Sequence, residues 1–269
     1  MSLNDILRKH GFSCTKRYGQ NFISDSNLLA AIALDGATAG DNVLEIGAGA
    51  GTLTAALCDM GAHVTAYEID ERLKPVLNDV LMGKDARIIF ADAMTADIDS
   101  LNLGDYRLVA NLPYYITTPV IFRFLYDPHL LSMTVMVQKE VAERICAKAG
   151  TPQYGALSAQ MQAMGSVRIT RIVPRSMFLP SPEVDSAVVR LDISPILPRE
   201  DLPGYRKTVA AAFNMRRKTL VNNLTAAYSI SKTTAAEIVT ELCGDQNARG
   251  ETLTPTQFIR LSQLLGEVK

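Results

Sequence analysis

The sequence predicts an α/β fold with a parallel sheet and a small C-terminal helical domain, and three observations support this. Apolar runs alternate with helical patterns, as in a sheet covered by helices on both faces. The first apolar run ends in three glycines at alternate positions. A stretch with three prolines and a glycine, Ser194 to Gly204, then interrupts the chain. We expect an α/β domain with an N-terminal arm over 1–194, a linker over 195–204 and a helical domain over 205–269.

The individual elements follow from these patterns in chain order. A basic arm comes first, and the helix that follows it over 24–34 has Ser24 or Asp25 as its cap. Strands are expected at 43–46, 64–67, 87–90 and 107–110. They alternate with helices at 52–60, at 71–82 and, on a weaker pattern, at 93–103. Further strands are expected at 132–137, 167–173 and 186–191, and helices after the linker at 204–213, 215–228, 231–242 and 255–266.

The glycine-rich turn after the first strand indicates a nucleotide-type ligand. Gly47, Gly49 and Gly51 have no Cβ, so a ligand can approach the backbone closely, whereas an ordinary strand-to-helix turn needs only one glycine. The spacing departs from the dinucleotide fingerprint, because Thr52 stands where its third glycine is expected. With Glu45 before it, the run resembles the first motif of class I S-adenosylmethionine-dependent methyltransferases, which are Rossmann-like.

The next strands also end in residues suited to a nucleoside. Glu68 can accept hydrogen bonds from ribose hydroxyls, a feature that dehydrogenases share. Asp92 can accept a bond from an adenine amino group, or it can cap a helix. Asn111 ends the fourth strand. Because ligands bind beyond the carboxyl ends of parallel strands, these positions predict a single pocket.

The segment after the fourth strand carries the predicted chemistry. Asn111-Leu112-Pro113-Tyr114 resembles the motif of enzymes that methylate exocyclic amines of bases. The Asn111 side-chain oxygen and the Leu112 carbonyl can each accept one N6–H of adenine, which frees the nitrogen lone pair for attack. Pro113 stiffens the loop, and Tyr114 can stack on the base. The alternative is a proline turn with core aromatics.

Two further features bear on a nucleic-acid partner. Phe178 precedes Pro180 and Pro182, and it either closes over the far face of a flipped base or belongs to the core. Basic residues that can contact phosphate occur in the arm and after the linker, at Lys16, Arg17, Arg206, Lys207, Arg216, Arg217 and Lys218.

Composition sets limits on the function. The net charge is −1, but residues 35–110 carry five Lys or Arg against thirteen Asp or Glu, and residues 111–269 carry eighteen against thirteen. This asymmetry suits a cationic cofactor in the first part and a polyanion in the second. Four cysteines and three histidines, scattered without metal-ligand spacing, predict no metal and a reducing cytoplasm. No apolar run is long enough to cross a membrane, and we expect a monomer.

Taken together, these motifs give the chain its resemblance to the small-subunit (16S) ribosomal RNA adenine N6,N6-dimethyltransferases, the kasugamycin-sensitivity family. F-N-x-R-R-K at 213–218, after F-x-P-x-P at 178–182, is specific to this family. The matching stretches are 19–23, 45–54, 67–70, 110–115, 136–142, 154–158, 178–189 and 213–220, with a weaker match at 249–258. Departures are Ile23 for leucine, Ala48 for proline and Ser181 for proline.

The resemblance implies S-adenosylmethionine as cofactor and two adjacent adenosines in the 3′-terminal hairpin of small-subunit rRNA, within the 30S subunit or its precursor, as substrate. It implies cofactor contacts at Asn21, Ile23, Gly47, Gly49, Glu68, Asp92 and Asn111, and a base pocket from Asn111, Leu112, Tyr114 and Phe178. Three alternatives stay open. They are the related large-subunit methyltransferases of macrolide resistance, a dinucleotide-binding dehydrogenase, and a ribosome-assembly protein with vestigial activity.

Overall fold

The computed structural model describes residues 2–15 and 18–267. The chain forms two compact units, each described here by itself. One unit comprises the chain up to Ala142 together with Arg168–Ile193, and the other comprises Glu143–Val167 and the chain from Ser194 onward. The chain leaves the first unit twice, after Ala142 and after Ile193. Residues 143–167, which the sequence placed in the first domain, group instead with the C-terminal helices.

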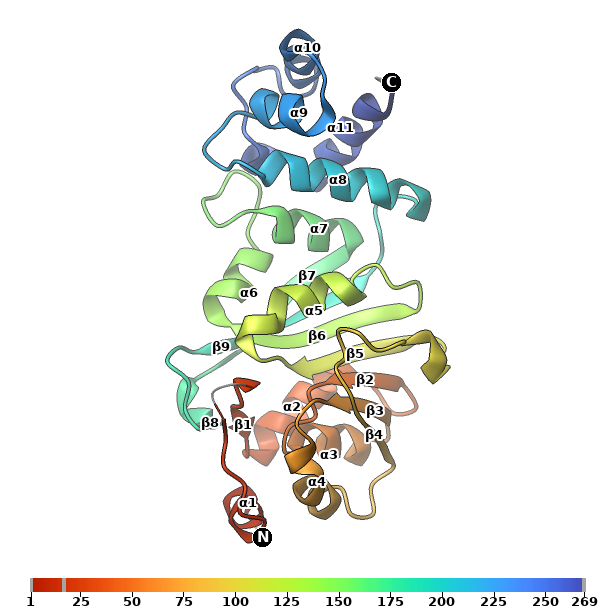
Figure 1. Cartoon of the computed structure of the whole chain (residues 1–269), viewed down its shortest axis with the longest axis vertical. Coiled ribbons are helices and arrows are strands. Elements are labelled where there is room, and N and C mark those ends of the chain that lie inside the picture. Colours follow the sequence, from red (N-terminus) through yellow and green to blue (C-terminus); the bar gives the residue numbers. More distant parts are fainter. Residues whose placement is uncertain (1, 16–17, 268–269) are drawn as a thin grey trace. The chain divides into compact units, whose positions relative to one another are not determined.

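The elements of the first unit alternate as the sequence predicts (Figure 1). Its helices and strands are α1 (Leu3–Lys9), β1 (Phe22–Ile23), α2 (Ser26–Gly36), β2 (Asn42–Ile46), α3 (Thr52–Asp59), β3 (His63–Glu68), α4 (Lys74–Val80), β4 (Ala86–Phe90), β5 (Tyr106–Asn111), α5 (Thr117–Phe124), β6 (Leu130–Gln138), β8 (Phe178–Leu179) and β9 (Ser186–Ile193). Helix α6 (Lys139–Ile145) and strand β7 (Gly165–Val173) cross from one unit to the other.

Within the described residues the strands form one sheet of seven and one of two. The order of the larger sheet is β4-β3-β2-β5-β6-β9-β7. Neighbours from β4 to β6 are parallel, and β9 runs antiparallel to β6. The order reverses between β2 and β5, because the chain first builds outward through β3 and β4 and then returns to β5. Ligands of doubly wound sheets bind at such a switch point, beyond the carboxyl ends of the strands.

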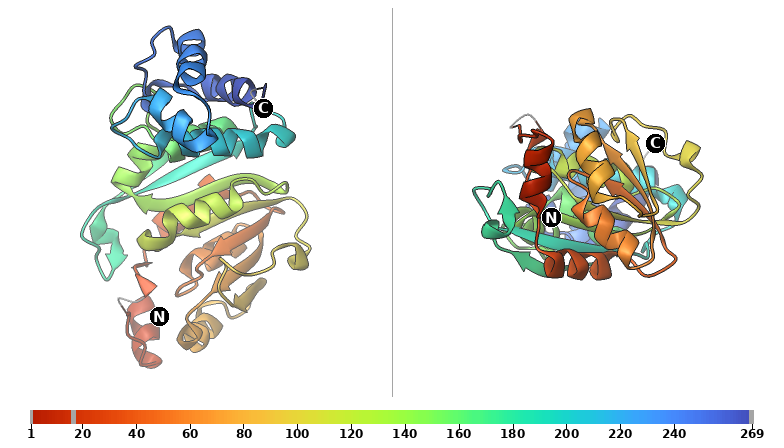
Figure 2. Two further views of the ribbon diagram at one scale, coloured as in Figure 1. Left: turned by 45° about the horizontal axis from the view of Figure 1, so that its top comes forward. Right: turned by 90° about the horizontal axis from the view of Figure 1, so that it is seen from below.

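Apolar burial on the sheet explains why these segments become strands and helices. Val43, Leu44, Leu108 and Val109 are fully buried in β2 and β5, so the central strands read as continuous apolar runs. Helices α2 and α3 pack together on one face, and α5 lies over the other (Figures 1 and 2).

Local capping settles the helix ends. Asp25 is the cap of α2, because its side chain accepts a hydrogen bond from the Leu28 amide at 2.7 Å.

The predicted helix over 93–103 is wrong. That segment contains only a 3-10 turn, Asp99–Leu101, which ends at Asn102 in the left-handed conformation with φ of 53°. Its Asp, Ser and Asn side chains bond to nearby backbone groups instead: Asp97 accepts from the Asp99 amide, and Ser100 donates to the Asp97 carbonyl. Such local bonds compete with helical ones.

The second unit is helical. It contains α7 (Ala156–Met164), α8 (Leu202–Phe213), α9 (Leu220–Tyr228), α10 (Lys232–Cys243) and α11 (Pro255–Glu267). Four aromatic rings form its centre, with Phe213 between Tyr154 at 6.1 Å and Phe258 at 5.8 Å, and Tyr205 edge-on to Phe258. Helix α9 begins at Leu220, later than the predicted 215, because Thr219 caps it through the Asn222 amide. In the described part of the chain, no helix is both long and apolar enough to traverse a bilayer.

Candidate functional site

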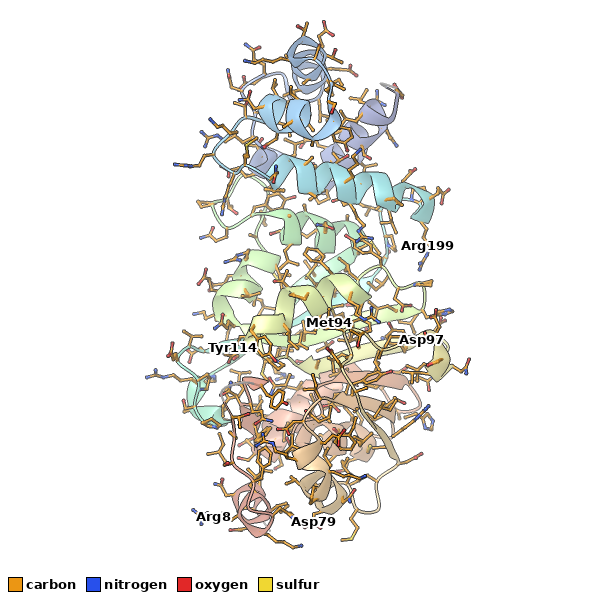
Figure 3. The ribbon with its side chains drawn as sticks, viewed as in Figure 1. Arg8, Asp79, Met94, Asp97, Tyr114 and Arg199 are labelled. Carbon is orange, nitrogen blue, oxygen red and sulfur yellow. The ribbon has the colours of Figure 1, made fainter. Side chains whose placement is uncertain are left out.

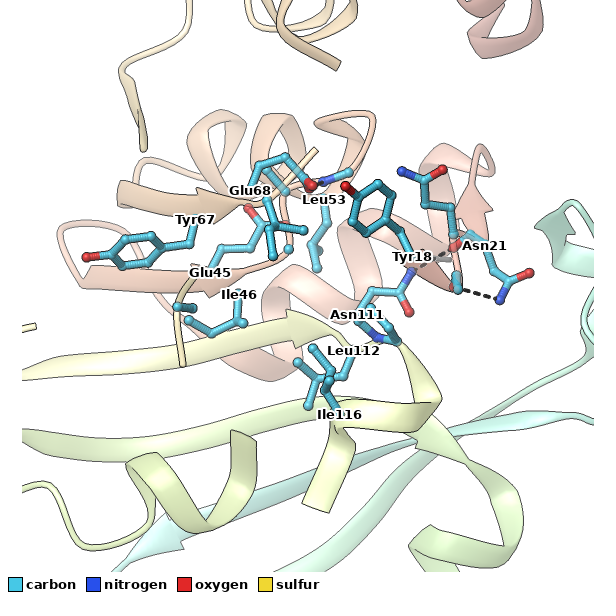
Figure 4. Close-up of a pocket in the computed structure, with 18 of the residues that line it drawn as sticks. Tyr18, Asn21, Glu45, Ile46, Leu53, Tyr67, Glu68, Asn111, Leu112 and Ile116 are labelled. Carbon is cyan, nitrogen blue, oxygen red and sulfur yellow. Dashed lines mark hydrogen bonds between the residues drawn. The ribbon is translucent and has the colours of Figure 1, made fainter. Parts of the chain in front are cut away.

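A pocket lies at the switch point of the large sheet, as the sequence predicts (Figure 4). Four segments of the first unit contribute most of its wall: residues 18–23 of the arm, the end of β2 with the glycine turn, the end of β3, and the segment that follows β5. The predicted site residues that line it are Asn21, Ile23, Gly47, Gly49, Glu68, Asp92, Asn111, Leu112, Pro113 and Tyr114.

The glycine turn needs its three glycines for conformation and for space. Gly47, Gly49 and Gly51 have φ values of 82°, 56° and 79°, a region that residues with a Cβ rarely adopt. A Cβ on Gly49 would also lie 3.1 Å from the Phe22 ring, and one on Gly51 would lie 2.9 Å from a methyl of Leu77. The turn therefore brings bare backbone to the pocket wall at the start of α3.

Glu68 joins this turn to the end of β3. One carboxylate oxygen accepts the Gly49 amide at 2.7 Å, and the other accepts the Asp70 amide at 2.8 Å. Burial raises the pKa of Glu68, and these amide bonds act in the opposite direction. Glu68 therefore holds the glycine turn in place as well as lining the pocket.

Glu45 is more deeply buried. Its carboxyl accepts a hydrogen bond from the Thr54 hydroxyl at 2.6 Å, and burial raises its pKa to about 8. At neutral pH the protonated form of this buried carboxyl therefore predominates. Glu45 lies within β2 and Glu68 ends β3, and the sequence carries no signal that Glu45 is the more deeply buried of the two.

Asp92 caps no helix, because the predicted helix after it does not form, and its role toward adenine stays a prediction. Its Oδ1 accepts the Met94 amide at 2.8 Å, as in a capped turn, and the residue also lines the pocket. Met94 lines the same wall and is labelled with Tyr114 in Figure 3.

Asn111 ends β5 with its amide in a defined orientation. Its Nδ2 donates to the main-chain carbonyl of Asn21 at 3.0 Å (Figure 4). Because a carbonyl only accepts, the amide atom that faces it must be the nitrogen, and the Oδ1 acceptor is directed elsewhere. Leu112 is buried, and its amide donates to the Met136 carbonyl at 3.3 Å, so the strand-end loop is tied to β6.

Tyr114 and Tyr115 follow Asn111 on a 3-10 turn. The Tyr114 hydroxyl bonds to the Ser186 hydroxyl at 2.8 Å, which fixes the ring beside the pocket. Tyr115 also lines the pocket but is 61% exposed, and its ring is 3.4 Å from where a Gly19 Cβ would stand. Tyr115 was not among the predicted site residues, although its place beside Tyr114 was a usable signal.

The structure does not bring Phe178 into the pocket wall. This side chain is 6% exposed and packs in the core of the first unit. It lies on β8, where it pairs with Ile23 of β1, and Ile23 does line the pocket. Phe178 therefore does not line the pocket itself, but its strand partner Ile23 does.

The predicted phosphate contacts differ in their surroundings. Lys16 and Arg17 lie outside the described residues. In the second unit, the Lys207 ammonium lies 4.4 Å from the centre of the Tyr228 ring. Arg206, on the same helix, also has contacts within the protein.

Phe213 of the predicted F-N-x-R-R-K motif ends α8, and residues 214–218 form an exposed turn between α8 and α9. Arg216 donates to the Pro152 carbonyl and lies 3.7 Å from Glu251, so this arginine also ties the turn to the rest of the unit. Arg217 and Lys218 are exposed. The buried Asn223 holds the turn, since it accepts the Met215 amide and donates to the Ala212 carbonyl. No local signal in the sequence marked Asn223 for this role.

The charged residue types that line the pocket restrict which kind of cofactor it can bind. They are Glu45, Glu68 and Asp92, and no Lys, Arg or His of the described residues lines it. A phosphate-bearing dinucleotide would have no cationic side chain as a partner there, whereas the acids Glu68 and Asp92 match a nucleoside with a sulfonium group; the protonated Glu45 adds no charge. Over residues 2–15 and 18–267, no cluster of three or more potential metal ligands was found. The sheet topology and this pocket define a class I S-adenosylmethionine-dependent methyltransferase.

Comparisons with known proteins give the family. The family model for "Ribosomal RNA adenine dimethylase" matches residues 11–265. Ribosomal RNA small subunit methyltransferase A of Deinococcus radiodurans is 49% identical over 220 residues, which cover 81% of this chain and 75% of that protein. The enzyme of the same name from Clostridioides difficile is 42% identical over 97% of this chain and 94% of that protein. This chain belongs to the ribosomal RNA adenine dimethylase family.

Solved structures agree with this fold. The 23S rRNA methyltransferase ErmE has a TM-score of 0.69 and 28% identity, with coverage of 91% of this chain and 100% of that one. A dimethyladenosine transferase from Plasmodium falciparum has a TM-score of 0.75 at 24% identity, with coverage of 89% and 95%, and supports the fold alone. The predicted family, fold class, enzyme class and cofactor are confirmed.

Proposed function

We propose that this protein transfers methyl groups to N6 of two adjacent adenosines in the 3′-terminal hairpin of small-subunit rRNA. Its substrate is the rRNA within the 30S subunit or a precursor, and it acts as a monomer in the cytoplasm. The relatives that are named as small-subunit methyltransferases support the choice of RNA. The 23S rRNA methyltransferase matches with lower identity, at 28%. The single observation that supports the proposed chemistry is the orientation of the Asn111 amide, which lines the same pocket as the glycine turn.

In this proposal Asn111 and Leu112 hold the target amine. The Asn111 Oδ1 and the Leu112 carbonyl each accept one N6–H, which moves the nitrogen toward tetrahedral geometry and frees its lone pair. Tyr114 stacks on the base, a contact worth about 1–3 kcal/mol in single-strand binders. The adenosine leaves its stack to reach the pocket.

S-adenosylmethionine supplies a methyl group that the sulfonium already activates. In this proposal Gly47, Gly49, Glu68 and Asp92, which line the pocket, hold its nucleoside part, and Asn21 and Ile23 contact it from the arm side. The protein therefore contributes mainly position, and no strong base is required, because the amine proton becomes acidic as the new bond to nitrogen forms. The S–CH₃ bond would break as the N–CH₃ bond forms, S-adenosylhomocysteine would leave as a neutral thioether, and the amine proton would pass to solvent.

The test is Asn111→Ala, assayed on undermethylated small subunits. Turnover should fall by about 100-fold or more, as for loss of a preorganised polar group at a reacting centre. The melting temperature should change little, and the affinity for the methyl donor, measured by calorimetry, should fall by a much smaller factor than turnover does. Near-normal turnover in this variant would overturn the proposed chemistry. Mapping the methylated adenosines in the wild-type reaction tests the choice of RNA separately.

A further inference from the structure

The short segment from Gly19 to Ile23, here called the arm segment, contacts several separate parts of the site. Its Asn21 carbonyl accepts from Asn111, and its Phe22 ring lies against Gly49 of the glycine turn. Ile23 pairs with Phe178 across β1 and β8. A displacement of this segment would therefore move both the glycine turn and the amine clamp, the name used here for Asn111 and Leu112, which hold the target amine in the proposed function.

The contact with Asn111 decides which end of the amide serves the substrate. An amide side chain presents either an acceptor or a donor when it rotates by a half turn. If the NH₂ end pointed to the target, two donors would oppose each other, because adenine N6 also carries hydrogens. The Asn21 carbonyl prevents that rotation, since it can accept only from Nδ2.

The pairing of β1 with β8 and a bond from Asn21 Nδ2 to the Gly19 carbonyl hold the segment around that carbonyl, and the Gln20 side chain adds a further anchor. Gln20 is adjacent to Asn21, and its Nε2 donates to Asp70 Oδ2 at 2.8 Å. Its Oε1 accepts the Thr15 amide at 3.1 Å, so both ends of the Gln20 amide are engaged. Asp70 is only 3% exposed.

Asp70 is itself a rigid anchor. Arg72 donates to both of its oxygens, from Nε at 2.8 Å and from Nη2 at 2.6 Å. These bonds from Arg72 lower the pKa of Asp70, so it is a charged acceptor at neutral pH. The Asp70 amide in turn donates to Glu68, the acid that holds Gly49. Asp70, which holds Gln20, therefore belongs to the same hydrogen-bonded group as the glycine turn.

We propose that Gln20 is a positioning residue for methyl transfer: its bond to Asp70 holds the Asn21 carbonyl where it orients the Asn111 amide. This role rests on the proposed function of Asn111. It is a role in turnover more than in donor affinity, because Glu68 is held by main-chain amides that a change at Gln20 leaves in place.

The first test replaces Gln20 by leucine, which keeps much of the side-chain volume and removes both hydrogen bonds. The value of kcat, at saturating donor and RNA, should fall about 10-fold or more, since small misplacements of a reacting group have such effects. The donor Kd should rise by a smaller factor than kcat falls, since the arm segment also borders the glycine turn, and the melting temperature should stay near that of the wild type. Lys9→Met is the matched control, because Lys9 also ties the N-terminal region to the first unit, through Asp79 at 2.6 Å (Asp79 is labelled in Figure 3).

The second test reverses the bond. Gln20→Glu places two carboxylates together, and Asp70→Asn weakens the anchor, so each single variant should lose kcat. In the double variant, the new amide at position 70 can donate to the new carboxylate at position 20, and the Thr15 amide keeps its acceptor. Arg72 Nη2 loses its Oδ2 acceptor, and the same new carboxylate is available to it. We expect the double variant to recover kcat relative to both single variants, and this comparison decides the matter if Gln20→Leu fails to fold.

Wild-type kcat in Gln20→Leu, or no recovery in the double variant, would overturn the role of Gln20. A loss explained wholly by donor affinity would do the same. Failure of the proposed function is distinguishable, because it appears as turnover in Asn111→Ala, whatever happens at Gln20.

Discussion

Ile23 and Phe178 face each other across the antiparallel pairing of β1 with β8. Ile23 lines the pocket, while Phe178 is buried in the core of the first unit. The loop that the sequence assigned to the target base is thus attached to the arm segment that orients Asn111. For Phe178 to cover a base, its ring has to leave the position that the structure gives it.

The first prediction separates a stacking role for Phe178 from a packing role. Phe178→Leu keeps most of the apolar volume and removes the aromatic face, so stability should change by less than about 1.5 kcal/mol. If the ring stacks on the base, turnover should nevertheless fall about 10-fold, as expected for loss of a stacking contact. Phe178→Tyr should retain activity. Full activity in Phe178→Leu, measured together with its melting temperature, would leave Phe178 as a core residue alone.

The second prediction concerns the exposed turn between α8 and α9. Arg217→Gln and Lys218→Gln should each weaken RNA binding and reduce the slope of log affinity against log salt by about 1, because each removes one phosphate contact. Arg216→Gln should in addition lower the melting temperature, since Arg216 bonds to Pro152 and approaches Glu251. Binding is measured at several salt concentrations.

The control for this turn is Lys232→Gln, which makes the same change of charge on an exposed residue of α10 in the same unit. Its salt slope should equal that of the wild type. Unchanged slopes in Arg217→Gln and Lys218→Gln would show that the turn does not contact phosphate.

The third prediction follows from the pKa of Glu45, which burial raises from 4.5 to about 8. The folded state binds this proton more tightly than the unfolded state does. The contribution to stability is therefore complete below pH 4.5 and is lost as the pH rises through about 8. Glu45→Gln cannot ionise, and its oxygen can still accept from Thr54, so its unfolding free energy should lack this decline. Urea unfolding between pH 5 and pH 8 measures the difference.

Thr54→Val provides the matched variant for Glu45. The Thr54 hydroxyl stabilises the ionised carboxylate and lowers its pKa. Its removal should raise the pKa of Glu45 further, so that the loss of stability continues to a more alkaline pH than in the wild type. Parallel curves for the wild type and Glu45→Gln would contradict the buried-acid explanation.

Most of the pocket could be predicted from sequence because its residues occur at the ends of strands. Gly47, Glu68, Asp92 and Asn111 follow apolar runs, and the topology of a parallel sheet brings such ends to one edge. The weak helical pattern at 93–103 gave a wrong prediction of a helix. The spacing of apolar residues carries no information about Asp and Ser side chains that bond to the local backbone. The grouping of residues 143–167 with the helical unit and the burial of Phe178 also had no local signal.

The sequence by itself determined the fold class, the glycine turn and the strand-end residues that line the pocket, because periodicity, glycine spacing and strand-end chemistry act over a few neighbouring residues. Only the tertiary structure decided that Asn21 orients Asn111, ninety positions further along the chain, and that Gln20 is held by Asp70. It also placed Phe178 in the core and engaged Arg216 with Pro152. Such contacts depend on how whole strands and helices pack, and the residues involved carry no mark of their distant partners.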